Sequence, residues 1–192
     1  MQGNLAPPDW TTIPAPADDG GARHLPGSRV PSVPLPATDG STVDLSALPG
    51  RAVVYAYPRT GLADGANPEG WDMIPGARGC TPQSCAFRDH FAELKALGVS
   101  HLFGLSTQDT AYQREAAERL RLPFPLISDQ RLDLARAMRL PFFEAGGMVL
   151  LKRLTLVLRD GAVEHVFYPV FPPDRSAADV AAWLSGEGRP AR

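Results

Sequence analysis

The sequence contains very little cysteine. Its 192 residues include only two, Cys80 and Cys85, with four residues between them. Small domains that rely on disulfides for stability carry a much denser set of cysteines, so a disulfide-held scaffold is excluded. In a reducing compartment, a close pair of cysteines more often serves redox or metal chemistry than structure. The pair is therefore the first candidate for chemistry in this chain.

Long hydrophobic runs and an excess of charge of one sign are also missing. No segment approaches the roughly 18–20 consecutive apolar residues that a membrane span requires. The first residues have neither the basic nor the apolar region of a secretory signal. We therefore expect a cytoplasmic protein without a membrane partner. The 19 basic and 21 acidic side chains leave a net charge of −2, so nothing favours nucleic acid as a partner.

The four histidines do not form a pattern that would hold a metal. They are His24, His90, His101 and His165. Metal ligands recur at short, regular spacings, which these residues lack, so we predict neither a metal nor another cofactor. The sequence is 44% hydrophobic, enough for one domain with a substantial core and for two domains at most.

Proline is abundant, and much of it lies near the N-terminus. Residues 1–36 combine proline with glycine and aspartate and show no hydrophobic periodicity, which favours an extended arm. Trp10 and Ile13 could attach this arm to the rest of the protein, and a mobile tail is the alternative. We place the folded domain at residues 37–187 and a short tail at 188–192.

Apolar runs and turn signals predict the strands. The predicted strands are residues 52–57, 99–106, 149–158 and 163–171. The first run is continuously apolar, as expected of a central strand that is covered on both faces. Asp39-Gly40, between short alternating flanks, predicts a β-hairpin.

Helical spacing and capping residues predict the helices. Phe87, Phe91, Leu94 and Leu97 form one face of a single helix that follows the cysteines and ends at Gly98. A capping box at Thr110 opens a second helix to about residue 121, Asp129 caps a third from about 131 to 139, and Ser176 caps the last. This order of elements is that of a thioredoxin-like α/β domain, with a central mixed sheet flanked by helices.

The cysteines lie where a loop passes into the first helix. Gly79 allows the backbone to approach a ligand closely, and Pro82 is tolerated in a first turn whose N–H groups have no helical partners. The positive end of the helix dipole favours the thiolate form of a cysteine at this place. From spacing alone, two ordinary thiols remain an equal alternative.

Several groups of residues resemble the bacterioferritin-comigratory, or Q-type, peroxiredoxins. They are Val53-Val54-Tyr55-Ala56-Tyr57-Pro58; Gly79-Cys80-Thr81 followed by Cys85, Phe87, Arg88 and Asp89; Gly104-Leu105-Ser106-Thr107; residues 122–129; and residues 153–158. The resemblance covers roughly residues 30–185. It implies a thiol peroxidase for hydrogen peroxide and organic hydroperoxides, recycled by thioredoxin or a related dithiol protein. We expect a monomer or a weak dimer.

The resemblance also assigns roles to single residues. It implies that Cys80 is the peroxidatic thiolate, Cys85 the resolving thiol and Arg153 the cation beside the thiolate. A thiolate is required because the thiol is not the nucleophile. The attack on peroxide yields a sulfenic acid, which a second thiol condenses to a disulfide.

The spacing of the two cysteines has a structural consequence. Residues five apart in a helix are separated by about 7.5 Å of rise and about 140° of rotation. Their Cα atoms then lie roughly 8–9 Å apart, beyond the ~7 Å limit for a disulfide. We therefore predict that the first turns of this helix unwind when Cys80 and Cys85 join.

The sequence departs from the family pattern upstream of Cys80. Met73 and Ala77 stand where a Pro and a Thr or Ser are usual, which we attribute to an insertion at residues 61–74. Thr60 could then loop back to supply the hydroxyl. Gln83 replaces the usual Glu and keeps its hydrogen bonding without the charge. The other supporting residues are Pro58, Gly79 and Thr81.

Two further functions remain open. A thioredoxin-like thiol-disulfide oxidoreductase normally has a CxxC pair and a cis-proline at the start of the third core strand, where this chain has Arg153. A non-enzymatic peroxide or redox sensor is the other possibility, because sensing and turnover both begin with a sulfenic acid. For Arg153 itself, an ordinary salt-bridging role beside Lys152 is the alternative.

Overall fold

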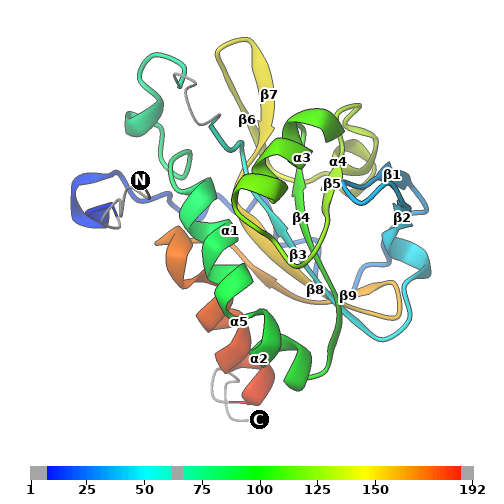
Figure 1. The fold of residues 1–192 in the computed structure, drawn as a ribbon. Helices are drawn as coiled ribbons and strands as arrows, with labels where there is room; N and C mark the ends of the chain where they lie inside the picture. Colours follow the sequence, from blue (N-terminus) through cyan, green and yellow to red (C-terminus); the bar gives the residue numbers. More distant parts are fainter. Residues whose placement is uncertain (1–7, 62–66, 187–192) are drawn as a thin grey trace.

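A five-stranded sheet forms the centre of the protein (Figure 1). The computed structural model describes residues 8–61 and 67–186. The strand order is β5 (Leu126–Ser128), β4 (Val99–Ser106), β3 (Arg51–Ala56), β8 (Leu154–Arg159) and β9 (Ala162–Phe167). β3 is parallel to β4 and antiparallel to β8. The predicted mixed α/β sheet is confirmed, and the continuously apolar run at 52–57 supplies its middle strand.

Three helices cover one face of this sheet. They are α1 (Cys80–Asp89), α2 (Phe91–Ala96) and α5 (Ser176–Ser185), which Figure 1 shows on the same side. Their apolar side chains share a buried cluster with Val53, Tyr55 and Tyr57 of β3 and its extension. The rings of Tyr55 and Phe87 stack with centroids 4.4 Å apart, which holds α1 against β3.

The opposite face is covered by α4 (Asp133–Met138), the hairpin of β1 (Pro34–Pro36) and β2 (Thr42–Asp44), and part of the N-terminal segment. The antiparallel pairing of β1 with β2 confirms the hairpin predicted at Asp39-Gly40. Ala22, Leu25 and Val30 are buried in the same cluster, so this part of the predicted arm packs on the core. The domain boundary at residue 36 stays a prediction, and the tail at 188–192 lies outside the described residues.

The remaining elements surround the sheet. α3 (Thr110–Arg119) packs against β5. Single 3-10 turns are η1 (Trp10–Thr12), η2 (Leu45–Ala47), η3 (Trp71–Met73) and η4 (Pro173–Arg175). A second hairpin, β6 (Phe142–Ala145) with β7 (Met148–Leu151), was not predicted.

The single strand predicted at 149–158 is wrong. The chain forms β7 and β8, which belong to different sheets, with Lys152 and Arg153 between them. The backbone N–H of Lys152 still donates to the carbonyl of Pro141, on the side of the hairpin, whereas Leu154 already pairs with Ala56 of β3. Apolar residues on both sides of the break conceal it in the sequence.

The single helix predicted to run to Leu97 is also wrong. α1 ends at Asp89 and α2 begins at Phe91, with His90 between them at φ −93° and ψ 5°. The His90 imidazole Nδ1 lies 2.9 Å from the carbonyl oxygen of Ala86. The apolar spacing continues across the break because both helices face the same cluster.

Two of the three predicted caps are corrected. Asp109, not Thr110, caps α3, because its carboxylate accepts a hydrogen bond from the backbone N–H of Tyr112 at 2.8 Å. Ser176 makes no cap; its hydroxyl is buried and contacts other side chains. Asp129 does accept from backbone N–H groups at the start of α4, those of Leu134 and Ala135.

Candidate active site

The loop before α1 is held in a narrow space. Gly79 has φ +108°, a conformation that residues with a side chain rarely adopt. A Cβ atom at this position would lie 2.5 Å from Pro173 Cγ and 2.8 Å from the ring of Trp10. Glycine is therefore required here both by backbone conformation and by contact, and η4 and the N-terminal segment fix the start of α1.

Cys80 is the first residue of α1 and is only 4% exposed. Its thiol donates to the carbonyl oxygen of Ala77 at 3.7 Å. The positively charged guanidinium of Arg153 contacts this sulfur, with Nη2 donating to Sγ at 3.3 Å. Together with the N-terminal end of the helix, this guanidinium stabilises negative charge on the sulfur.

Arg153 lies at the end of the sheet where β3 ends, because the next residue, Leu154, pairs with Ala56. It is 3% exposed. Besides Sγ, its Nη2 contacts the carbonyl oxygens of Gly76, Ala77 and Arg78 at 3.2–3.3 Å. The guanidinium thus organises the whole turn that leads into α1.

One donor of Arg153 has no partner. Its buried Nε makes no hydrogen bond to any described residue. In a guanidinium, Nε and Nη2 share one edge of the planar fork and can bind two acceptors side by side. Here Nη2 faces the sulfur, so Nε offers a second donor along the same edge.

A buried polar network holds Arg153 in place from behind. Nη1 donates to the amide oxygen of Gln83. The amide nitrogen of Gln83 donates to the hydroxyl of Ser176 at 3.3 Å, and that hydroxyl lies 3.2 Å from the hydroxyl of Thr155. Neither Ser176 nor Thr155 could be assigned to the site from the sequence, because both are distant from Gln83 along the chain and belong to no motif at the cysteines.

Cys85 lies in the second turn of α1 in a different environment. Both cysteines have free thiols, but Cys85 is half-buried whereas Cys80 is buried. Partial burial raises the pKa of the Cys85 thiol, the positive charge of Arg88 opposes this rise and the negative charge of Asp89 adds to it. Since both cysteines lie within α1, the predicted unwinding on disulfide formation applies to this helix.

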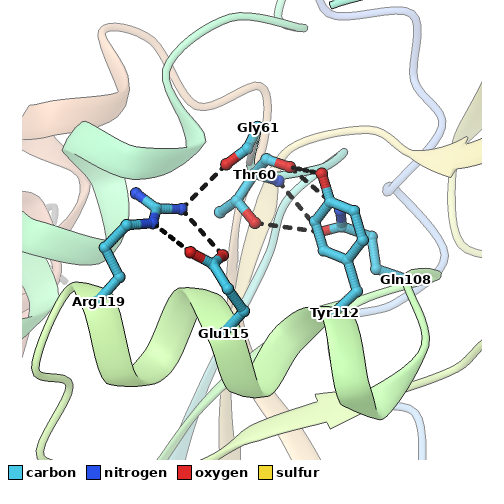
Figure 2. A network of polar contacts seen from close by, with 6 residues as sticks. All are labelled: Thr60, Gly61, Gln108, Tyr112, Glu115 and Arg119. Atoms are coloured by element: carbon cyan, nitrogen blue, oxygen red, sulfur yellow. Dashed lines mark hydrogen bonds and ion pairs between the residues drawn. The ribbon is translucent and has the colours of Figure 1, made fainter. Parts of the chain in front are cut away.

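Thr60 does not reach Cys80 in this structure. Figure 2 shows its side chain directed at Gln108, whose amide oxygen accepts from both the backbone N–H and the hydroxyl of Thr60. Tyr112 of α3 donates to the Thr60 carbonyl, and Arg119 donates to the carbonyl of Gly61. These contacts attach the start of the loop that follows β3 to α3. Among the described residues, no hydrogen bond joins Thr60 to the sulfur of Cys80.

The other predicted supporting residues divide into two groups. Gly79 and Gln83 contact the site directly, as described above. Pro58 is buried after β3, and Thr81 is half-buried in the first turn of α1. No hydrogen bond from the Thr81 hydroxyl to a described residue was found, so its contribution stays a prediction.

The predicted insertion is partly described, since residues 62–66 lie outside the described residues. Trp71 is 4% exposed and shares a small cluster with Ala77 and Leu150. Ala77, which stands where the family usually has a hydroxyl, is fully buried there. Trp71 and Phe143 have ring centroids 6.3 Å apart, whereas Phe142 is 56% exposed. Trp71 and Phe143 therefore form an apolar group around Ala77, and the exposed Phe142 is not part of it.

Residues 8–61 and 67–186 contain neither a cluster of metal-binding side chains nor a membrane-spanning helix. No three His, Cys, Asp or Glu side chains in these ranges are grouped so that they could hold a metal ion. Within the same ranges, no helix has both the length and the apolar character needed to cross a membrane.

Comparisons with known proteins place the chain among redox proteins. A family model described as Redoxin matches residues 25–183. Chloroplastic peroxiredoxin Q of Oryza sativa subsp. japonica is 34% identical over 151 residues, which are 78% of this chain and 61% of that protein. Peroxiredoxin Bcp of Escherichia coli (strain K12) is 32% identical over 146 residues, 73% of this chain and 83% of that protein. The chain thus spans about three fifths of the rice relative's length and most of the bacterial one.

Solved structures agree with these relatives. Peroxidoxin BcpB from Mycobacterium tuberculosis has a TM-score of 0.66 at 28% identity and covers 87% of this chain and 100% of its own. Peroxiredoxin Q of Xanthomonas campestris has a TM-score of 0.65 at 22% identity, with 86% and 98% covered, which shows the shared fold. The chain therefore belongs to the redoxin family and, within it, to the peroxiredoxins of the Q and Bcp type.

Proposed function

We propose that this chain is a thiol peroxidase that reduces hydrogen peroxide and organic hydroperoxides. The observation that supports this most directly is the 3.3 Å contact between Arg153 Nη2 and Cys80 Sγ at the start of α1. A peroxide bound at the free Nε would lie along the same guanidinium edge, next to the sulfur. Arg153 would then bind nucleophile and substrate together.

The chemical step follows from this arrangement. The Cys80 thiolate attacks the terminal oxygen of R–O–O–H, an S–O bond forms and the O–O bond breaks. Sulfur is oxidised by two electrons to the sulfenic acid, and the peroxide is reduced to the alkoxide, which takes a proton from solvent to leave as the alcohol or, for hydrogen peroxide, as water. Donors fixed before the reaction stabilise the charge that develops on the leaving oxygen without reorganising.

Resolution requires Cys85 to reach the sulfenic acid. The Cys85 thiolate attacks the sulfur of Cys80, an S–S bond forms, the S–O bond breaks, and the hydroxide that leaves takes a proton from solvent to become water. Because both residues belong to α1, the helix has to open before the sulfurs meet. A dithiol protein such as thioredoxin then reduces the disulfide through a mixed disulfide. Cytoplasmic location and a monomeric or weakly dimeric state complete the proposal.

The test is peroxide consumption coupled to thioredoxin, thioredoxin reductase and NADPH. We expect turnover by the wild type, none by Cys80→Ser, and one sulfenic-acid equivalent without thioredoxin-linked turnover by Cys85→Ser. Full activity in Cys80→Ser would contradict the peroxidase. A single oxidation of the wild type that thioredoxin reverses only slowly would favour the sensor, and insulin reduction without peroxide consumption would favour the disulfide reductase.

A further inference from the structure

The N-terminal segment reaches the turn that leads into Cys80. The Redoxin match begins at residue 25, and residues 8–24 come before it. A Cβ atom at Gly79 would lie 2.8 Å from the indole of Trp10, so this ring lies directly against the residue before Cys80. A Cβ atom at Gly76 would lie 3.5 Å from the ring of Pro16. The segment therefore contacts both ends of the turn at residues 76–79.

Trp10 is held against this turn by contacts of its own. Its Nε1 group donates to Asp174 at 2.8 Å, and its ring packs edge-on against Phe171 with centroids 6.0 Å apart. Pro173, the neighbour of Asp174, also lies against Gly79, since a Cβ atom there would be 2.5 Å from its Cγ. Trp10 and η4 thus form one group of side chains packed around the start of α1.

The segment is also attached to the domain beyond Trp10. The Asp19 carboxylate pairs with Lys152 at 2.6 Å and accepts from the Tyr168 hydroxyl at 2.7 Å. These hydrogen bonds hold the pKa of the Asp19 carboxyl well below its usual range. Further along, the backbone N–H of Gly27 donates to the carbonyl of Val163 in β9 at 2.8 Å. The segment is therefore fixed at several points between Trp10 and the sheet.

These contacts belong to one of the two states that α1 has to adopt. The turn at 76–79 has to stay in place while Cys80 attacks peroxide, because Arg153 contacts both the sulfur and carbonyl groups of this turn. The first turn of α1 then has to open before Cys85 can reach Cys80. Opening that turn would separate it from Trp10. A contact that exists in only one of two states favours that state, so Trp10 stabilises the closed α1.

We propose that Trp10 is a positioning residue that keeps α1 closed around Cys80 during the attack on peroxide and slows the opening that brings Cys85 to the sulfur. It acts through Gly79, and Asp19 supports it by fixing the rest of the segment. The balance between reaction with peroxide and disulfide formation is then set in part by residues outside the matched family region. This role in the reaction rests on the peroxidase activity proposed above.

Two matched pairs of variants test this role. Trp10→Ala removes the ring beside Gly79, and Thr12→Ala is its control at an exposed position of the same 3-10 turn. Asp19→Ala releases the segment from its partners on the domain. Asp18→Ala is the control for this second variant, because the Asp18 carboxylate accepts a hydrogen bond within its own turn.

Three rates are measured in each variant. Hydrogen exchange of the reduced protein reports the opening of α1 at residues 83–85, with the amides of β3 as the reference for a general loosening of the fold. Stopped-flow kinetics with hydrogen peroxide give the rate of Cys80 oxidation and the rate of the disulfide formation that follows. The exchange measurement does not require peroxidase activity, so it tests the contact with α1 separately from the chemistry.

We expect Trp10→Ala to speed both the exchange of residues 83–85 and the formation of the disulfide about tenfold, the factor that loss of one hydrogen bond and one aromatic contact would give. Oxidation of Cys80 should slow in the same variant, because the turn that orients the sulfur is less fixed. Asp19→Ala should change the three rates in the same directions by less. Exchange in β3 and all rates of the two controls should stay within about twofold of wild type.

Wild-type exchange and wild-type disulfide formation in Trp10→Ala would overturn this role, and so would equal changes in Thr12→Ala or in β3. If the wild type consumes no peroxide, the peroxidase activity itself is wrong and the kinetic role of Trp10 falls with it. The exchange rates of the reduced protein would still show in that case whether Trp10 holds α1 closed.

Discussion

The two cysteines of α1 lie five residues apart and have opposite surroundings. Cys80 is buried, contacts the guanidinium of Arg153 and follows a glycine fixed by Trp10 and Pro173. Cys85 is half-buried and faces Arg88 and Asp89 near the protein surface. The difference shows how one short helix can hold two thiols in contrasting surroundings, one buried against a cation at its first residue and the other half-buried in its second turn.

Replacing Arg153, the cation beside Cys80, should have the largest effect on the difference between the two cysteines. We expect Arg153→Lys to slow the reaction of Cys80 with hydrogen peroxide on the order of 100-fold, the scale seen when one preorganised donor is lost. Lysine provides a point charge without the planar edge that binds sulfur and peroxide together. Stopped-flow measurement of Cys80 oxidation checks this.

Arg159→Lys is the matched control, because Arg159 is exposed at the far end of β8, the strand that begins directly after Arg153. It should react at the wild-type rate. Equal rates for Arg153→Lys and wild type would mean that the guanidinium only supports the turn before α1.

Oxidation should abolish the structural difference between the two ends of α1. When Cys80 and Cys85 join, we expect the backbone amides of residues 83–85, the first in α1 to donate to helical carbonyls, to exchange with solvent on the order of 100-fold faster than in the reduced protein, because the helix has opened. Hydrogen exchange followed by mass spectrometry compares the two states. An equally protected α1 in the oxidised protein, with the disulfide closed, would disprove the unwinding.

The thiol environments also predict a pH dependence of resolution. Burial raises the pKa of Cys85, so at neutral pH this residue is mainly protonated and its thiolate is scarce. Below that pKa the thiolate fraction grows about tenfold per pH unit, and disulfide formation should accelerate accordingly. Single-turnover kinetics between pH 6 and pH 9, roughly the range below the ordinary thiol value, measure this. A flat profile would show that helix opening limits the rate.

We expect the smallest effect from changing Gln83, which lies on the side of Arg153 away from Cys80. Gln83→Leu removes the partner of both Arg153 and Ser176 inside the protein. We expect a loss of about 2 kcal/mol in the free energy of unfolding, since buried polar groups left without partners cost about this much. Urea unfolding measures it. Gln130→Leu, at an exposed position, is the control and should change stability little.

Much of the fold could be predicted from the sequence, because local signals and the core agree. The apolar run of β3 and the Asp39-Gly40 hairpin follow from short-range patterns, whereas the apolar spacing after the cysteines predicts one helix and misses its break at His90. The break between β7 and β8 could not be predicted, since apolar residues on both sides make the run look continuous. The break arises because β7 pairs with β6 whereas β8 pairs with β3 and β9. The pairing of β8 with β3 depends on residues far away in the sequence.

The candidate site was predictable only in part for the same reason. Cys80, Cys85 and Arg153 were selected through family resemblance, and the structure places Arg153 against Cys80. The hydrogen bond from Gln83 to Ser176 spans 93 residues, and the packing of Trp10 on Gly79 joins the arm to α1. Proline-rich sequence gives no periodicity from which such packing could be inferred. The contact of Thr60 with Gln108 could not be inferred either, because Gln108 comes from another part of the chain.

The position of Trp10 against Gly79 has an optical consequence. The indole lies beside the first turn of α1, and its Nε1 donates to Asp174 in a partly buried setting. Opening that turn would expose the ring to water and shift its fluorescence emission to longer wavelength. If α1 opens on oxidation as we predict, the emission of Trp10 would report the redox state of the cysteines, and Trp10→Phe would identify the contribution of this ring among the three tryptophans.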